Sequence, residues 1–166
     1  MEPRLGIYIH IPFCASKCGY CDFYSCAGAA DRMADYQHAL LEHIEESAGR
    51  IAPAYIDTVY FGGGTPSFYG AARLIELLDA VKATGRLLKR AEVTVEVNPD
   101  SVRLHDLRAL HKAGFNRLSI GMQSANNDLC RGCTHGCKQS FRAIIVLCPR
   151  YFSKRWKHRE DTANGR

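Results

Sequence analysis

The chain has 166 residues, 46% of them hydrophobic, and a formal net charge of +5 at pH 7. This composition suits one domain with a buried core, and it excludes both a disordered chain and a membrane-spanning one. The positive charge does not predict a nucleic-acid partner. From residue 138 onward eight basic residues stand against two acidic ones, whereas fourteen basic and fifteen acidic residues precede them, so the excess belongs to the tail.

Strand and helix signals alternate along most of the chain. Short apolar, β-branched runs predict strands at residues 5–11, 58–61, 93–97 and 117–120. Helical periodicity fills the three intervals, and we expect Asp31 to cap the first helix, Gly49 to end it, and Gly85 and Gly114 to end the next two. Alternating units of this kind require a parallel sheet with crossover helices, so the fold class is α/β. In such folds the loops after the strands build the site.

The loop after the first strand carries Cys14, Cys18 and Cys21 in a C-x3-C-x2-C spacing. Three thiolates can each hold one iron of a four-iron cubane, which leaves the fourth iron open to a substrate or cofactor. A ferredoxin-like carrier needs a fourth cysteine, and a zinc ribbon pairs C-x2-C units, so both fit this spacing poorly. Structural zinc stays an alternative. Cys26 is an alternative fourth ligand, although we favour a free thiol in the loop before the first helix.

The eight cysteines also bear on the compartment in which the chain works. No secretory signal precedes them, so a disulfide framework is not expected. In a reducing compartment thiols serve metals or catalysis, and we therefore expect a cytoplasmic protein.

Further motifs stand at the ends of the later strands, at residues 61–66 (FGGGTP), 96–99 (EVNP) and 116–124 (NRLSIGMQS). Together with residues 8–21 (YIHIPFCASKCGYC), they resemble in order the motifs of the radical S-adenosylmethionine (radical SAM) superfamily, and specifically the family of oxygen-independent coproporphyrinogen III oxidase and its relatives. Asp22 and Phe23 stand where the oxidases carry a further cysteine. That detail favours the haem-chaperone (HemW) branch.

The resemblance implies a fold and a set of cofactor contacts. The fold is a partial (β/α) barrel of which the chain supplies about the first four βα units. Cys14, Cys18 and Cys21 would hold a [4Fe-4S] cluster, and S-adenosylmethionine would chelate its open iron and be cleaved to a radical. The positions carried over as contacts to S-adenosylmethionine are Tyr8, Tyr20, Gly63, Gly64, Thr65, Glu96 and Gln123.

Taken without the resemblance, these contact positions have plainer readings. The glycines alone would form a tight turn, the two tyrosines would be packing residues, and Glu96 and Gln123 would be solvated side chains. His10 is given no catalytic role, and we assign no catalytic residue.

The implied function lies in haem or porphyrin metabolism. One reading is an oxidoreductase like the oxygen-independent oxidase, and the alternatives are a haem chaperone without oxidase activity or an inactive, truncated fragment of either. The expected partners are porphyrin or haem as a ligand and an electron donor such as flavodoxin or ferredoxin, with neither nucleic acid nor a membrane span.

The resemblance ends near Leu129. We expect residues 1–129 to form the N-terminal part of the radical SAM core and residues 130–166 to form a divergent, partly disordered basic tail. His135 occupies the position of a family arginine that contacts the cofactor. A second cluster on Cys130, Cys133 and Cys137 is conceivable from their spacing, but we do not favour it.

Overall fold

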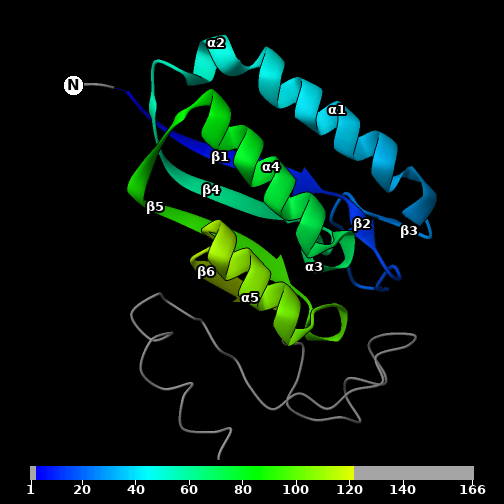
Figure 1. The fold of residues 1–166 in the computed structure, drawn as a ribbon. Coiled ribbons are helices and arrows are strands. Elements are labelled where there is room, and N and C mark those ends of the chain that lie inside the picture. The colour runs from blue at the N-terminus through cyan, green and yellow to red at the C-terminus, as the bar shows by residue number, and fades with distance from the viewer. Residues whose placement is uncertain (1–2, 122–166) are drawn as a thin grey trace, which may run out of the picture.

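The computed structural model describes residues 3–121, which contain two parallel sheets. The main sheet has four strands in the order β1-β4-β5-β6, all parallel (Figure 1). Its strands are β1 (Arg4–Ile11), β4 (Tyr55–Gly63), β5 (Arg86–Val97) and β6 (Arg117–Ile120). The second sheet pairs β2 (Phe13–Cys14) with β3 (Cys26–Ala27) and closes the base of the cysteine loop.

Helices connect the strands of the main sheet, and the three long ones, α1, α4 and α5, cover one face of it (Figure 1). The helical segments are η1 (Ala30–Arg32), α1 (Met33–Glu46), α2 (Ala48–Ile51), α3 (Pro66–Tyr69), α4 (Ala71–Thr84), η2 (Pro99–Ser101) and α5 (Leu104–Ala113). This arrangement confirms the α/β class and the partial barrel, of which the described residues hold the first three βα units and the strand of the fourth. Within the described residues no helix combines the length and the hydropathy that a membrane crossing requires.

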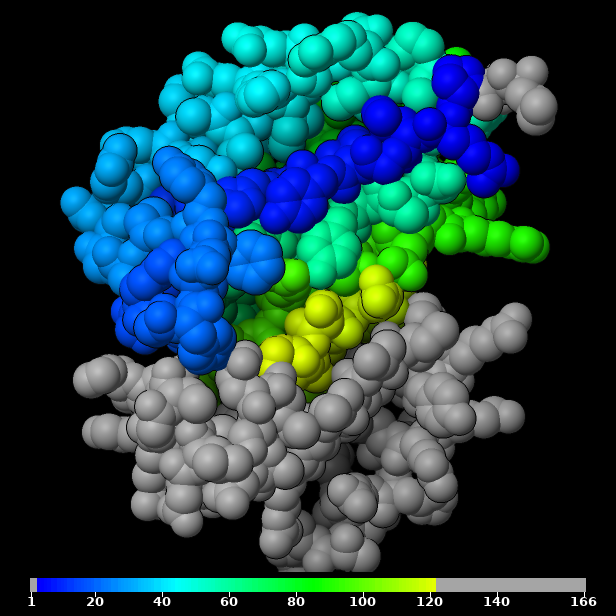
Figure 2. Space-filling model, turned by 180° about the vertical axis from the view of Figure 1, so that it is seen from behind, coloured from blue at the N-terminus to red at the C-terminus, as the bar shows by residue number. Residues whose placement is uncertain are grey.

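Alternation along the strands separates an apolar face from a polar one. The strand side chains that face the helices are buried, and together with side chains of α4 they form one core. Its fully buried members include Ile11, Val59, Phe61 and Val95 from the strands and Leu74, Leu77, Leu78 and Val81 from α4. Each such side chain contributes about 1.5–3 kcal/mol by leaving water. The intervening positions carry Tyr8, His10, Tyr60, Glu92, Glu96 and Arg117 on the opposite face. Figure 2 looks onto this polar face, from the side opposite to that of Figure 1, with β1 in dark blue and β6 in yellow.

The expected helix ends are confirmed for two helices and wrong for the first. Gly85 caps α4, and Gly114 caps α5 in the left-handed conformation at φ 110°. Asp31 is not a cap, because it lies inside η1 and α1 begins at Met33 without any side-chain cap. Gly49 does not end α1 either. The helix stops at Glu46, and Gly49 lies within α2, whose Ile51 is buried.

A buried hydroxyl group ties α1 to α3 below the cysteine loop. Tyr69 is completely buried, and its hydroxyl donates to Gln37 Oε1 at 2.7 Å, with the Met33 carbonyl 3.2 Å away as a second, longer contact. Its ring stacks on Phe13 with 5.3 Å between centroids. The first residue of β2 is therefore anchored on the helical layer.

The buried tyrosine predicts a loss of stability at high pH. Burial raises the pKa of Tyr69 to about 12. The folded state keeps this proton above the usual tyrosine pKa of about 10, where the unfolded state loses it, so the free energy of unfolding should fall by up to about 1.4 kcal/mol per pH unit between pH 10 and 12.

Tyr69→Phe tests this dependence. The variant should unfold about 1–2 kcal/mol more easily at neutral pH, because the oxygen of the buried Gln37 side chain loses its donor, and it should show a shallower alkaline slope. Urea unfolding at a series of pH values measures both quantities. Equal alkaline slopes in the variant and the wild type would contradict the prediction.

Candidate functional site

The structure brings the sequence motifs to one edge of the main sheet. The cysteine loop follows β1, the glycine loop closes β4, and Glu96 lies one residue before the end of β5. All strands are parallel, so these carboxyl ends share the same edge. Three of the four motifs are therefore neighbours, whereas the fourth continues past residue 121, so that Gln123 lies outside the described residues.

The glycine loop is hydrogen-bonded directly onto the start of the cysteine loop. The Gly64 amide donates to the Ile11 carbonyl at 2.8 Å, and the Thr65 amide donates to the Phe13 carbonyl at 2.8 Å. The Thr65 hydroxyl lies 3.5 Å from Cys14 Sγ. The two loops thus form one unit at the base of the first cysteine.

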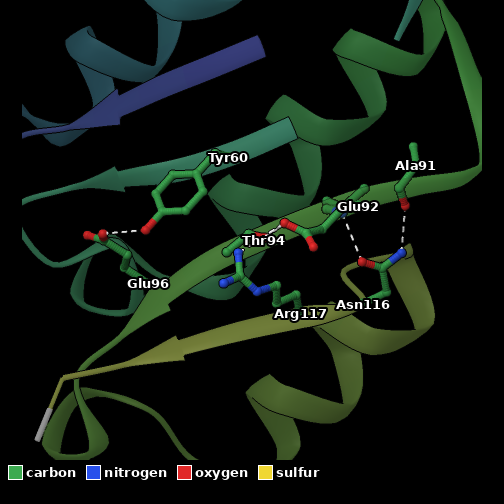
Figure 3. Close-up of polar contacts among 8 residues, drawn as sticks. Tyr60, Ala91, Glu92, Thr94, Glu96, Asn116 and Arg117 are labelled. Carbon is green, nitrogen blue, oxygen red and sulfur yellow. Dashed lines mark hydrogen bonds and ion pairs between the residues drawn. The ribbon is translucent and has the colours of Figure 1, made fainter. Parts of the chain in front are cut away.

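Glu96 is held by two donors from β4. Tyr60 donates its hydroxyl to Oε1 at 2.6 Å, and the Gly63 amide donates to Oε2 at 3.2 Å (Figure 3 shows the pair with Tyr60). Burial first, and then the bond to this carboxylate, raise the pKa of Tyr60. The carboxylate is thereby fixed at the end of β5.

The amides of the glycine loop are used within the protein. Gly63 gives its N–H to Glu96, and Gly64 and Thr65 give theirs to the strand that leads into the cysteine loop. The backbone groups that this loop can present to a ligand are therefore its carbonyl oxygens. A primary ammonium group has only donors to offer, so it is the kind of ligand group that suits such a loop.

His10 ties the far end of the cysteine loop back to β1. Its Nε2 lies 2.8 Å from the Tyr24 carbonyl, which can only accept, so Nε2 carries the proton. Nδ1 then accepts from the Tyr8 hydroxyl at 3.0 Å. An added Cβ at Gly63, which has φ 119°, would come within 2.5 Å of the His10 ring, so only glycine fits beside it.

The three motif cysteines are free thiols, each partly exposed. Cys18 and Cys21 are joined by a tight turn in which the Cys21 amide donates to the Cys18 carbonyl at 3.1 Å. Lys17 braces the loop by donating to the Phe23 carbonyl at 2.7 Å.

The grouping of the side chains bears on which kind of metal centre they could form. Among residues 3–121, no three His, Cys, Asp or Glu side chains are grouped so as to hold one metal ion. Such a grouping is what a single-ion centre requires. A cubane would instead take one thiolate at each of three separate irons. Three reduced, partly exposed thiols on one loop are the donor set that such a cluster uses.

The remaining predicted positions lie on β1, on the cysteine loop and in the tail. Tyr20 is 53% exposed on the loop between Cys18 and Cys21, and Tyr8 is 58% exposed on the polar face of β1. Cys26 is an exposed free thiol on β3, with Sγ 3.7 Å from the Pro12 carbonyl. The tail cysteines Cys130, Cys133 and Cys137, and His135, lie outside the described residues.

Comparison with known proteins identifies the family. The model of the radical SAM superfamily matches residues 8–158 of this sequence. The chain belongs to the radical SAM superfamily. Within it, the heme chaperone HemW of Escherichia coli K12 is 38% identical over 144 residues, and HemW of Mycobacterium tuberculosis H37Rv is 42% identical over 122 residues. The oxygen-independent coproporphyrinogen III oxidase of Salmonella typhimurium is 33% identical over 131 residues.

A solved radical SAM structure shares the fold. Coproporphyrinogen III oxidase (HemN) from Escherichia coli superposes with a TM-score of 0.73 at 30% identity, covering 78% of this chain and 30% of that one. The aligned parts of the three sequence relatives cover 85%, 72% and 78% of this chain but only 38%, 31% and 29% of the relatives. The chain therefore spans about a third of the length of the radical SAM proteins that it matches.

Sequence reasoning missed one residue of this radical SAM site. Tyr60 was not singled out, although it forms the short bond to Glu96. The signal was available, because Tyr60 stands two residues before Gly62 in β4 and alternation places both on the polar face.

Proposed function

We propose that this chain binds a [4Fe-4S] cluster through Cys14, Cys18 and Cys21 and binds S-adenosylmethionine beside it, as a radical SAM protein of haem or porphyrin metabolism. The observation that carries the proposal is the hydrogen-bonded union of the glycine loop with the cysteine loop, next to the fixed Glu96 carboxylate. This union brings the glycine loop to the base of the first cysteine, where the Thr65 hydroxyl lies 3.5 Å from Cys14 Sγ. Residues 1–129 would be the N-terminal part of the core, and residues 130–166 a divergent tail.

The residues of the chain have distinct tasks in this proposal. Gly63, Gly64 and Thr65 supply backbone around the amino end of S-adenosylmethionine, while Tyr8, Tyr20, Glu96 and Gln123 contact its remainder. When bound and reduced by a flavodoxin or a ferredoxin, the cluster would supply one electron for cleavage of the sulfonium carbon–sulfur bond. A reducing compartment such as the cytoplasm suits the free thiols.

Cofactor binding and cleavage can be tested together. The full chain is reconstituted with iron and sulfide under anaerobic conditions, and the binding of S-adenosylmethionine is measured by equilibrium dialysis. After reduction with dithionite, 5'-deoxyadenosine and methionine are quantified. A reconstituted chain with about four irons that neither binds nor cleaves S-adenosylmethionine would refute the proposal.

A haem-delivery role is the second candidate. Asp22 and Phe23 follow the third cysteine in place of the oxidase-type cysteine, and the HemW proteins of two bacteria match at 38% and 42% identity. In this role haem is the ligand, and the cluster and S-adenosylmethionine regulate its transfer. Measuring decarboxylation of coproporphyrinogen against transfer of haem to an apo-haemoprotein distinguishes the two candidates.

A further inference from the structure

The carboxylate of Glu96 is oriented by one donor on each oxygen. Tyr60 occupies Oε1 and the Gly63 amide occupies Oε2, so rotation of the carboxylate would break both bonds. A carboxylate has about four lone-pair positions, and two remain for a ligand. Both of these partners are neutral donors, and no ion pair among the described residues includes Glu96.

The ring of Tyr60 packs on Tyr8 and occupies space that Gly62 leaves open. It stacks on Tyr8 with 6.0 Å between centroids and 26° between planes. On the other side, a Cβ added at Gly62 would lie 2.6 Å from Tyr60 Cε1 and 3.2 Å from Glu96 Cδ. The glycine therefore leaves the space in which the phenol reaches across from β4 to β5 (Figure 3).

A neighbouring cation on this face is committed elsewhere. Arg117 Nη1 lies 3.0 Å from Glu92 Oε1, which also accepts from the Thr94 hydroxyl at 3.2 Å (Figure 3). On β5, Glu92 stands two residues before Thr94 and four residues before Glu96. Arg117 therefore has a carboxylate of its own, and the phenol of Tyr60 sets the direction of Glu96.

We propose that Tyr60 is a positioning residue that fixes the Glu96 carboxylate toward bound S-adenosylmethionine, with Gly62 clearing the space for its ring. This inference rests on the proposed function, because it takes Glu96 as a ligand contact. The hydroxyl acts through Glu96 and does not itself touch the ligand. Its removal should weaken binding of S-adenosylmethionine without unfolding the chain or changing its iron content.

The test compares Tyr60→Phe with Tyr55→Phe in the reconstituted full chain. Both substitutions remove one hydroxyl from β4, but Tyr55 lies at the opposite end of the strand with its ring against Arg86. Tyr60→Phe should raise the Kd for S-adenosylmethionine roughly tenfold, the order expected when a ligand group loses its orientation, and Tyr55→Phe should leave it unchanged. Iron content and melting temperature should stay at wild-type values in both.

A second readout reports the contact without any cofactor. In the apo protein labelled with 13Cζ-tyrosine, the NMR signal assigned to Tyr60 through Tyr60→Phe should shift in Glu96→Gln, because the phenol then donates to a neutral amide oxygen. A Kd within twofold of wild type for Tyr60→Phe would overturn the inference while the proposed function stands. An unshifted Tyr60 signal would overturn it as well. A wild-type chain that binds no S-adenosylmethionine would overturn the proposed function and this inference with it.

Discussion

Simultaneous replacement of Cys14, Cys18 and Cys21 by alanine is expected to abolish iron-sulfur loading of the chain. The wild type should take up about four irons and an equal amount of sulfide per chain, and the triple variant should retain almost none, since each thiolate holds a different iron. The three side chains are partly exposed on one loop. Their loss therefore removes ligands without opening the core. Iron, acid-labile sulfide and visible absorbance are measured after anaerobic reconstitution.

Cys26→Ala is the matched control for the triple variant. Cys26 is a free, exposed thiol at the end of the same loop, and its sulfur contacts the Pro12 carbonyl. Its loss should leave the iron content unchanged, and so should joint replacement of Cys130, Cys133 and Cys137. Full iron uptake by the triple variant would end the cluster proposal. Iron loss in Cys26→Ala would instead make Cys26 the fourth ligand and close the open iron.

The order of strands and helices was predictable because the hydrophobic periodicity and the glycines that end helices agreed along most of the chain. Buried β-branched runs and glycine stops set β4, α4 and α5 close to where they were expected. The start of β5 was missed by seven residues, since residues 86–90 (RLLKR) show no alternation of apolar and polar side chains. Arg86 and Leu87 are extended because they pair with Tyr55 and Ile56 of β4. Local propensity gave way to sheet pairing there.

The first helix shows a second limit of pattern reading. Asp31 had the chemistry of an N-cap, yet η1 is closed by the backbone bond from the Arg32 amide to the Ala29 carbonyl, at 3.1 Å. Gly49 had the chemistry of a stop, yet Ile51 is buried against the region of Gly85, where an added Cβ would meet it at 2.6 Å. A local backbone bond decided the first end and tertiary packing decided the second, and the residue pattern showed neither.

The site was predictable as a set of loops but not as a set of contacts. Spacing named the cysteines and the glycine loop, and the parallel sheet explained why they meet. The residue pattern did not show that the amides of Gly63, Gly64 and Thr65 are all bonded inside the protein. It placed Tyr60 on the polar face but did not show its bond to Glu96. Such pairings depend on strand register, which a pattern of residue types does not determine.

Gly64→Ala is expected to damage both stability and cluster loading. A Cβ at this position would lie 2.8 Å from the Pro12 carbonyl carbon and 2.9 Å from the Phe13 carbonyl oxygen. Both are backbone atoms that cannot rotate away, so the glycine loop must separate from the cysteine loop and lose the Gly64–Ile11 hydrogen bond. We expect a loss of about 2–3 kcal/mol in the free energy of unfolding. The retained iron should fall by more than half, because Cys14 follows directly on the displaced segment.

Gly19→Ala separates this steric effect from the general cost of replacing a glycine. Gly19 lies inside the cysteine loop, and an added Cβ there would meet nothing within 4 Å. Its unfolding free energy should stay within about 0.5 kcal/mol of wild type, with full iron uptake. Urea unfolding of the apo chain and iron analysis after reconstitution measure both variants. If Gly64→Ala unfolded and loaded iron like Gly19→Ala, the contact between the two loops would not position the cluster, and the glycine would be needed only for close approach of the ligand.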